Sequence, residues 1–327
     1  MPSSPQKDFS ALSSRAKRGI CFCGVLSWLL LPAPVRAQNL PARPRITGID
    51  HVRISITDIE KSRDFYSELF GVRFKGGMCF YGWSPCFTVG WGQNQTIELE
   101  KGPATDTKDR IAEIAFATDD VEGMRAYLVA RGVTASRISK HISPYDGKPY
   151  DAHFEVRDPE GIPLSFIQRF AVPIDDPFGA PWWVRIIHAG FIVRDRAGAD
   201  HFYKDILGFG PYWHGGMKDD KDDWVAMQVP DGTDWVEYML NISTTADKHT
   251  LGVMNHIALG VKDIHATQQQ LIKNGWKPGE EPKLGRDGKW QLNLYDPDDT
   301  RVEFMEFTPT QKPCCSEYTG PHPGPKK

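Results

Sequence analysis

The sequence predicts an α+β protein assembled from repeated modules, each with a strand, a helix and further strands. Three observations predict this fold class. One half of the chain repeats a pattern that is found in the other half. Each copy opens with alternating residues, as a half-buried strand does. Each copy then carries apolar residues at helical spacing, between an aspartate suited to cap a helix and a glycine suited to end it.

The first repeated segment covers residues 50–71 and returns as residues 187–208. Its strand begins at His51 in one copy and at His188 in the other, 137 residues later. The predicted helix of each copy has an aspartate before it and a glycine after it: Asp58 with Gly71, and Asp195 with Gly208. A repeat over this distance makes duplication the main feature of the chain's organisation.

A second, looser segment follows each copy, over residues 111–132 and again over residues 254–275. Each ends in a further strand that is entered through a turn, at residues 158–161 in one copy and 296–299 in the other. Four modules in two pairs are therefore expected. The expected segments are a signal peptide (1–37), the first pair (46–170), a linker (171–185), the second pair (186–309) and a flexible tail (310–327).

Residues 1–37 have the composition of a secretory signal peptide. Basic residues up to Arg18 precede an apolar run over residues 20–31, and a Val-Arg-Ala exit suits cleavage after Ala37. The run is shorter than the roughly 20 apolar residues that span a bilayer. We therefore expect an exported protein, periplasmic or extracellular, with no membrane attachment after cleavage. In such an oxidising compartment Cys79 and Cys86 could form a disulfide, whereas Cys314 and Cys315 receive no assigned function.

The charge balance excludes one class of partner. The chain has 39 Lys and Arg against 42 Asp and Glu, which gives a formal net charge of −3. A nucleic-acid-binding protein would carry a strongly basic surface. We therefore expect a small-molecule substrate and no nucleic acid.

Four such modules, opening with a strand that bears His or Glu and closing with a strand of the Val-Glu-Phe type, resemble the vicinal oxygen chelate superfamily. This family includes glyoxalase I, extradiol dioxygenases, methylmalonyl-CoA epimerase and bleomycin resistance proteins. The resemblance covers almost all of residues 46–309. It implies paired βαβββ modules, each pair a half-open curved sheet around a cleft, with a metal held by first and last strands. Whether the modules pair within a monomer or exchange in a homodimer stays open.

The alternation of the strands supports the same positions independently. His256 shares a strand face with Ala258 and Gly260, and His188 shares one with Gly190, so small side chains leave room beside each imidazole. The resemblance implies four ligands for one divalent ion: His188, Glu237, His256 and Glu303. Two imidazoles and two carboxylates suit Ni, Co, Zn, Mn or Fe(II).

The first half offers a weaker set at the matching places. His51, Glu98 and Glu113 occupy ligand positions, but Ser165 replaces the expected acid. We interpret this set as a degenerate second site, with a second working metal centre as the alternative. Arg53 lies on the face of His51, where it could bind an anionic substrate group or form a surface ion pair.

The number of ligands favours glyoxalase-like lyase or isomerase chemistry. An octahedral metal has six positions, and a ring-cleaving dioxygenase needs three of them for a bidentate catecholate and O2. Four protein ligands leave two, which suffice for two vicinal substrate oxygens. In that chemistry the metal acts as a Lewis acid that stabilises an enediolate, while Glu237 or Glu303 moves the proton.

Two alternatives remain. An Fe(II) extradiol ring-cleaving dioxygenase would use His188, His256 and Glu303, but its family signature separates a Tyr from the Asp-Pro by two residues. Here Tyr295 directly precedes Asp296. A non-catalytic protein, similar to bleomycin resistance proteins, would bind a small molecule without metal.

Further candidates for substrate binding lie in the second half. Asn241 matches the asparagine that glyoxalase I uses near glutathione, whereas Ile192 stands where its glutathione-binding arginine would be. His214 is a candidate second acid or base. It follows Trp213, one of several tryptophans in this half that could line a cleft for a planar ligand or belong to the core.

Overall fold

The computed structural model describes residues 40–70, 86–89, 95–102, 110–143, 146–170 and 185–325, with the backbone alone for 86–89. The expected signal peptide, nearly all of the expected linker, Cys79 and the side chain of Cys86 lie outside the described residues, so the possible Cys79–Cys86 disulfide does too. No helix of the described part is long and apolar enough to cross a membrane.

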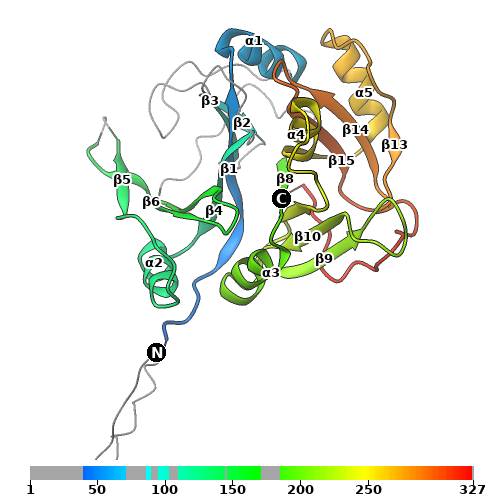
Figure 1. Ribbon diagram of the computed structural model, residues 1–327. Helices are drawn as coiled ribbons and strands as arrows, with labels where there is room; N and C mark the ends of the chain where they lie inside the picture. Colours follow the sequence, from blue (N-terminus) through cyan, green and yellow to red (C-terminus); the bar gives the residue numbers. More distant parts are fainter. Residues whose placement is uncertain are drawn as a thin grey trace, which may run out of the picture. The chain divides into compact units, whose positions relative to one another are not determined.

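The first half forms one seven-stranded sheet (Figure 1). Its strands are β1 (Ile46–Ile56), β2 (Cys86–Val89), β3 (Gln95–Lys101), β4 (Ile111–Thr118), β5 (Ser139–Ile142), β6 (Pro149–Arg157) and β7 (Pro163–Arg169). They are ordered β2-β3-β1-β4-β7-β6-β5. The two modules join through their first strands, because β1 and β4 pair antiparallel while each runs parallel to the last strand of its own module.

The second half repeats this arrangement with eight strands. They are β8 (Arg185–Ile192), β9 (Gly210–Gly215), β10 (Trp224–Gln228), β11 (Trp235–Met239), β12 (His256–Val261), β13 (Lys283–Leu284), β14 (Trp290–Tyr295) and β15 (Arg301–Glu306). Their order is β13-β14-β15-β12-β8-β11-β10-β9, again with an antiparallel contact between the two first strands, β8 and β12. Two curved half-barrel sheets with helices confirm the α+β class and the tandem modules, and adjacent modules of one chain pair with each other.

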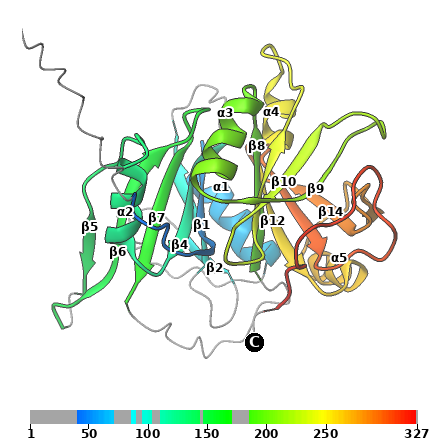
Figure 2. The same cartoon turned by 90° about the horizontal axis from the view of Figure 1, so that it is seen from below.

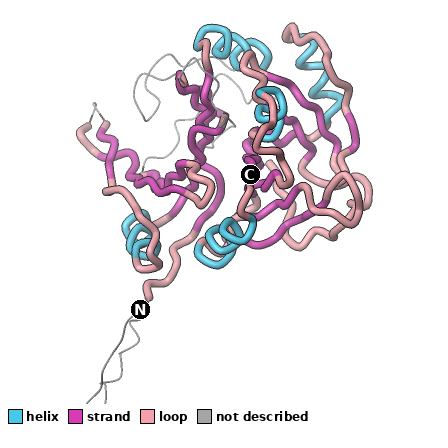
Figure 3. Tube along the Cα trace, viewed as in Figure 1, coloured by secondary structure: helices cyan, strands magenta, loops and turns pink. Residues whose placement is uncertain are grey.

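The helices lie against the strands, as Figures 2 and 3 show. They are α1 (Ile59–Asp64), η1 (Phe65–Leu69), α2 (Val121–Val129), α3 (Arg196–Ala199), η2 (Asp200–Ile206), α4 (Lys248–Met254) and α5 (Ile264–Lys273). Both predicted caps are confirmed, since Asp58 accepts hydrogen bonds at the start of α1 and Asp195 at the start of α3. In both copies the helix widens to a π-helical turn, η1 or η2. Gly208 follows the second with a φ of 78°, a conformation that favours glycine at a helix end.

The repeat also creates two equivalent contacts between the halves. The Tyr66 hydroxyl donates to Asp296 at 3.2 Å, and the Tyr203 hydroxyl donates to Asp158 at 3.1 Å. Both aspartates open the turns that precede the last strands. Burial raises the pKa of each carboxyl to about 6.

The second sheet has one face that packs into the main core and a second face that combines the predicted ligands with a smaller apolar cluster, which includes Trp213, Trp235 and Met305. On β8, Ala189 and Phe191 belong to the main core, where Phe191 packs on Tyr203 at 5.8 Å between ring centroids. His188 and Gly190 alternate with them and face the other way, as the sequence predicts. This second face carries the candidate site.

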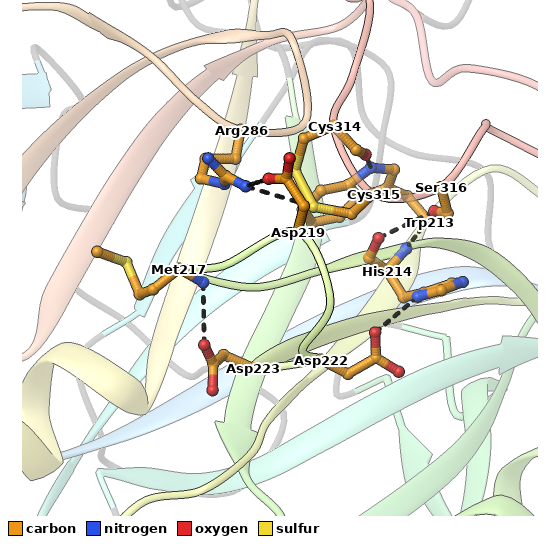
Figure 4. Close-up of a disulfide and its surroundings, with 10 residues drawn as sticks. All are labelled: Trp213, His214, Met217, Asp219, Asp222, Asp223, Arg286, Cys314, Cys315 and Ser316. Carbon is orange, nitrogen blue, oxygen red and sulfur yellow. Dashed lines mark hydrogen bonds and ion pairs between the residues drawn. A yellow bond between two sulfur atoms is a disulfide. The ribbon is translucent and has the colours of Figure 1, made fainter.

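The C-terminal segment differs from the flexible tail that we expected. Residues up to 325 pack on the second sheet: Trp213 Nε1 donates to the Cys314 carbonyl at 3.2 Å, and the Gln228 amide donates to the Pro321 carbonyl at 2.9 Å. Cys314 and Cys315 form a disulfide in this segment (Figure 4). The apolar surface that Cys314 and Tyr318 cover explains the packing, which the Pro and Gly content of the segment does not reveal.

Candidate metal centre

Four strands bring the four predicted ligands to one point. His188 comes from β8, Glu237 from β11, His256 from β12 and Glu303 from β15, which are the first and last strands of two modules. The register aligns Glu237 and His256 with the same residue of β8, Gly190. It also aligns Ala258 with both His188 and Glu303. The register of the paired strands therefore brings the four side chains together.

The donor atoms lie within contact distance of one another. His188 Nε2 and His256 Nε2 are 3.0 Å apart. Oε2 of Glu303 is 3.4 Å from the first nitrogen and 3.6 Å from the second. Oε2 of Glu237 is 3.9 Å and 3.4 Å from them. Both histidines and Glu303 are buried, while Glu237 keeps a partly exposed side chain.

Gly190 makes room for this arrangement. A β-carbon at Gly190 would overlap the Cε1 and Nδ1 atoms of the His256 ring. On the other side, the Trp235 indole packs on the His188 ring with 4.7 Å between centroids. Gly190 thus leaves the space that the His256 ring occupies, and Trp235 restricts the orientation of the His188 ring.

The hydrogen bonds of His256 leave its Nε2 as an acceptor. Arg301 Nη2 lies 2.8 Å from this nitrogen, and because a guanidinium can only donate, Nε2 offers its lone pair. The proton then resides on Nδ1, which lies 3.3 Å from the Met254 carbonyl oxygen. Burial, together with the charges of Arg301 and His188, holds the pKa of His256 well below its usual value. A neutral imidazole with its lone pair on Nε2 is the form that ligates metals, and Arg301 would have to give up this hydrogen bond for the nitrogen to bind an ion.

Glu303 is held in its charged form. Burial alone would raise the pKa of this carboxyl, but Arg301 and then His188 outweigh burial and lower the pKa below its usual value. Arg301 Nη2 lies 4.0 Å from Glu303 Oε2. The cluster therefore combines a carboxylate with a neutral imidazole.

The donor set fits a divalent ion. For metal–nitrogen bonds of about 2.1 Å, two adjacent octahedral ligands are about 3.0 Å apart, which matches the separation of the two Nε2 atoms. His188, Glu237 and His256 together form a group able to hold a metal ion. Glu303 adds a fourth donor, an oxygen at similar distances from the two nitrogens.

A cavity of about 330 Å³ opens beside the cluster. Glu237, Glu303 and Arg301 line it together with Trp213, Trp224 and Trp235. Such a volume is at the lower end for small-molecule sites, so a small ligand fits.

Two predicted substrate residues lie elsewhere. His214 alternates with Trp213 on β9 and does not line this cavity. Its Nδ1 lies 2.7 Å from Asp222 Oδ1 (Figure 4). Asn241 lies beyond the end of β11, takes a φ of 63° and donates to Asp223 at 2.8 Å. Neither residue reaches the cluster from these positions.

In the first half an arginine lies among the matching residues. Arg53 Nη1 is 2.7 Å from Glu113 Oε2, and Arg53 Nε is 3.2 Å from Glu98 Oε2. His51 Nε2 lies 4.0 Å from Glu113, which also accepts a hydrogen bond from Ser165. Arg53 therefore forms a largely buried ion pair, and its guanidinium supplies a positive charge to these carboxylates.

Sequence reasoning missed three features. Arg301 precedes Glu303 by two residues, so the alternation of β15 could have placed it on the site face. Lys289 lines the cavity from the loop before β14, where no periodic pattern applies. The third feature is another group of side chains that could hold a metal ion, on β5 and β6: His141, Asp151 and His153.

In this group the Asp151 carboxylate accepts hydrogen bonds from both imidazoles. Asp151 Oδ1 lies 2.8 Å from His141 Nδ1 and 3.4 Å from His153 Nδ1. Burial alone would raise the pKa of Asp151, but hydrogen bonds from both histidines outweigh it and lower the pKa to about 2. The group is thus a hydrogen-bonded network around an ionised carboxylate.

Comparisons with known proteins agree with the fold. The family model of the Glyoxalase/Bleomycin resistance protein/Dioxygenase superfamily matches residues 48–166 and 185–304. Among solved structures, the Mn(II)-bound glyoxalase from Novosphingobium aromaticivorans aligns with a TM-score of 0.61 at 19% identity, covering 80% of this chain and 83% of that one. Native homoprotocatechuate 2,3-dioxygenase from Arthrobacter globiformis aligns with a TM-score of 0.59 at 18% identity, covering 82% and 81%. A comparison with curated protein sequences finds no match.

Proposed function

This chain belongs to the Glyoxalase/Bleomycin resistance protein/Dioxygenase superfamily, and we propose that it is a metal-dependent enzyme with glyoxalase-like lyase or isomerase chemistry. Its substrate would be a small molecule with two vicinal oxygen atoms. His188, Glu237, His256 and Glu303 would hold one divalent ion, either Ni, Co, Zn, Mn or Fe(II). Bound there, the ion would supply Lewis-acid polarisation of a substrate oxygen.

The position of Glu237 carries this proposal. Its Oε2 lies as close to His256 Nε2, at 3.4 Å, as Glu303 lies to His188. A fourth protein ligand leaves two of six octahedral positions, which suit a bidentate substrate and leave none for O2. Glu237 also faces the cavity from a partly exposed position, where it could take a proton from the substrate and return it.

A dioxygenase is the second candidate. Glu303 is buried beside both histidines, whereas Glu237 is more exposed, so His188, His256 and Glu303 alone could form the two-histidine, one-carboxylate set of Fe(II) oxygenases. The neighbouring structures include homoprotocatechuate 2,3-dioxygenases, at 18–19% identity.

Replacing Glu237 separates the two candidates. In Glu237→Gln loaded anaerobically with Fe(II), the first proposal expects weakened metal binding and no ring cleavage when catechol and O2 are added. One tightly held Fe(II) with catechol cleavage would instead establish the dioxygenase. If neither the wild type nor this variant binds a divalent ion, both enzymes are excluded and non-catalytic small-molecule binding remains.

We also propose that the protein is exported, with cleavage after Ala37. The charged start, the apolar run and the Val-Arg-Ala exit support this, and the Cys314–Cys315 disulfide suits an oxidising compartment. The intact mass of protein recovered from the periplasm should correspond to a chain that begins at Gln38. Recovery of the full-length chain in the cytoplasm would contradict export.

A further inference from the structure

Four cationic side chains line the cavity beside the cluster, and they differ in their partners. Three of them have a carboxylate within 4.0 Å: Lys283 has Glu280, Arg286 has Asp219 and Arg301 has Glu303. Lys289 forms no such pair within the part of the chain that the structure describes. It is nevertheless fully buried, whereas the other three retain exposed surface.

Aromatic rings surround the Lys289 ammonium. Its Nζ lies 4.7 Å from the ring centroid of Trp235 and 5.2 Å from those of Tyr212 and Tyr318. It donates one hydrogen bond, to the Tyr212 hydroxyl at 3.2 Å. An ammonium has three donors, so ring faces and one hydroxyl compensate this charge incompletely.

Asp287 is the acid whose charge acts most strongly on Lys289, but its carboxylate accepts hydrogen bonds from other donors. It accepts from the Lys289 backbone at 3.1 Å, from the Gln291 amide at 3.3 Å and from the Tyr318 hydroxyl at 3.2 Å. A buried cation without an anion in contact costs free energy. Burial accordingly lowers the pKa of Lys289 to about 8, so that the amine is still mostly charged at pH 7.

Lys289 lies one aromatic ring away from the candidate metal centre. Trp235 packs on His188 with 4.7 Å between ring centroids, and the Lys289 ammonium lies over the same indole ring. Glu237 and Glu303 line the same cavity. A ligand that fills this cavity and contacts the cluster therefore lies beside Lys289.

We propose that Lys289 binds a carboxylate of the substrate and thereby sets the substrate class: small organic acids that also carry two vicinal oxygens. The vicinal oxygens would face the cluster, and an apolar body would contact Trp213 and Trp224, which line the cavity. This rests on the proposed function for the vicinal oxygens. The carboxylate preference rests on Lys289 alone.

The test compares a charged probe with its uncharged isostere. Calorimetry measures binding of 3,4-dihydroxybenzoate and 3,4-dihydroxybenzamide to the zinc-loaded protein, since zinc supports no redox turnover. The variant is Lys289→Met, which keeps an unbranched side chain without charge. The matched control is Lys283→Met, which removes an exposed lysine from the same cavity.

We expect the wild type to bind the carboxylate at least about tenfold more tightly than the amide, as one charge-assisted contact allows. Lys289→Met should lose this preference and Lys283→Met should keep it. Equal affinity of the wild type for both probes would overturn the proposal even if Lys289→Met does not fold. So would a preference that persists in Lys289→Met, or a wild type that binds neither probe.

A second arm separates this inference from the proposed function. If Lys289 only balanced the charges of Glu237 and Glu303, Lys289→Met would change zinc affinity and leave the ratio between probes unchanged, which contradicts the proposal. His256→Ala should lose zinc and weaken both probes while keeping their ratio. Failure of zinc binding in the wild type with an intact ratio would refute the metal site and support Lys289.

Discussion

Gly190 gives the sharpest structural test of the candidate metal centre. A β-carbon in Gly190→Ala would overlap Cε1 and Nδ1 of His256 and come within 2.7 Å of its Nε2. Side chains normally stay about 3.4 Å or more from such a carbon, so the imidazole must rotate or β8 and β12 must separate. Either movement displaces a proposed ligand without removing it.

The magnitude follows from what is displaced. Overpacking of this kind costs about 1–3 kcal/mol of folding free energy. Misplacing a ligating imidazole should weaken metal binding at least about 100-fold, the upper range for losing the groups that merely orient ligands. A 100-fold loss corresponds to about 2.7 kcal/mol of binding free energy, which is comparable to the folding cost and is measured separately from it.

The assay is competitive zinc titration against a chromophoric chelator, with thermal unfolding of the metal-free protein alongside. Gly210→Ala is the matched control, because it is also a strand glycine and its added β-carbon would meet nothing within 4 Å. Wild-type zinc affinity in a folded Gly190→Ala protein would refute the reasoning.

Further predictions concern stability. The pKa of Asp296 is raised to about 6 in the fold, so the folded state holds a proton that the unfolded state loses near pH 4, and the unfolding free energy falls as pH rises between these values. In urea unfolding, the free energy of unfolding of the wild type should fall by about 3 kcal/mol more between pH 4 and pH 7 than that of Asp296→Asn. The same pH dependence in both proteins would contradict this. Arg53→Met should destabilise the protein by about 3 kcal/mol, because Glu98 and Glu113 lose their buried counter-ion. Chemical denaturation at pH 7 measures that loss, and an unchanged midpoint would show that Arg53 is not needed to neutralise these carboxylates. Tyr66→Phe should lower the free energy of unfolding by about 1 kcal/mol, because it removes one hydrogen bond between the halves. Thermal unfolding measures this loss, and an unchanged midpoint would contradict the prediction.

The positions of the cluster could be predicted because strands have a fixed period. Alternation along β8 and β12 places His188 and His256 on one face, and the repeat identifies the strands that pair. Arg53 follows from the same rule, since it lies two residues after His51. Its ion pairs with Glu98 and Glu113 could not be predicted, because they depend on the register of β1 against β3 and β4, which the sequence does not reveal.

Residues outside regular strands could not be placed in this way. Asn241 is a predicted substrate-binding residue that does not continue the alternation of β11, because the strand ends at Met239 and the chain turns there. Lys289 is buried in part because Tyr318, from the C-terminal segment, packs against it. Such burial depends on tertiary packing, for which local periodicity carries no signal.

The metal content of the purified protein tests the central claim most directly. Elemental analysis after growth with the candidate metals should give about one divalent ion per wild-type chain, and near none in His188→Ala and His256→Ala that remain folded. His51→Ala, at the equivalent place in the first half, should retain the ion. An ion that survives in His256→Ala, or is lost in His51→Ala, would contradict a single metal centre at His188, Glu237, His256 and Glu303.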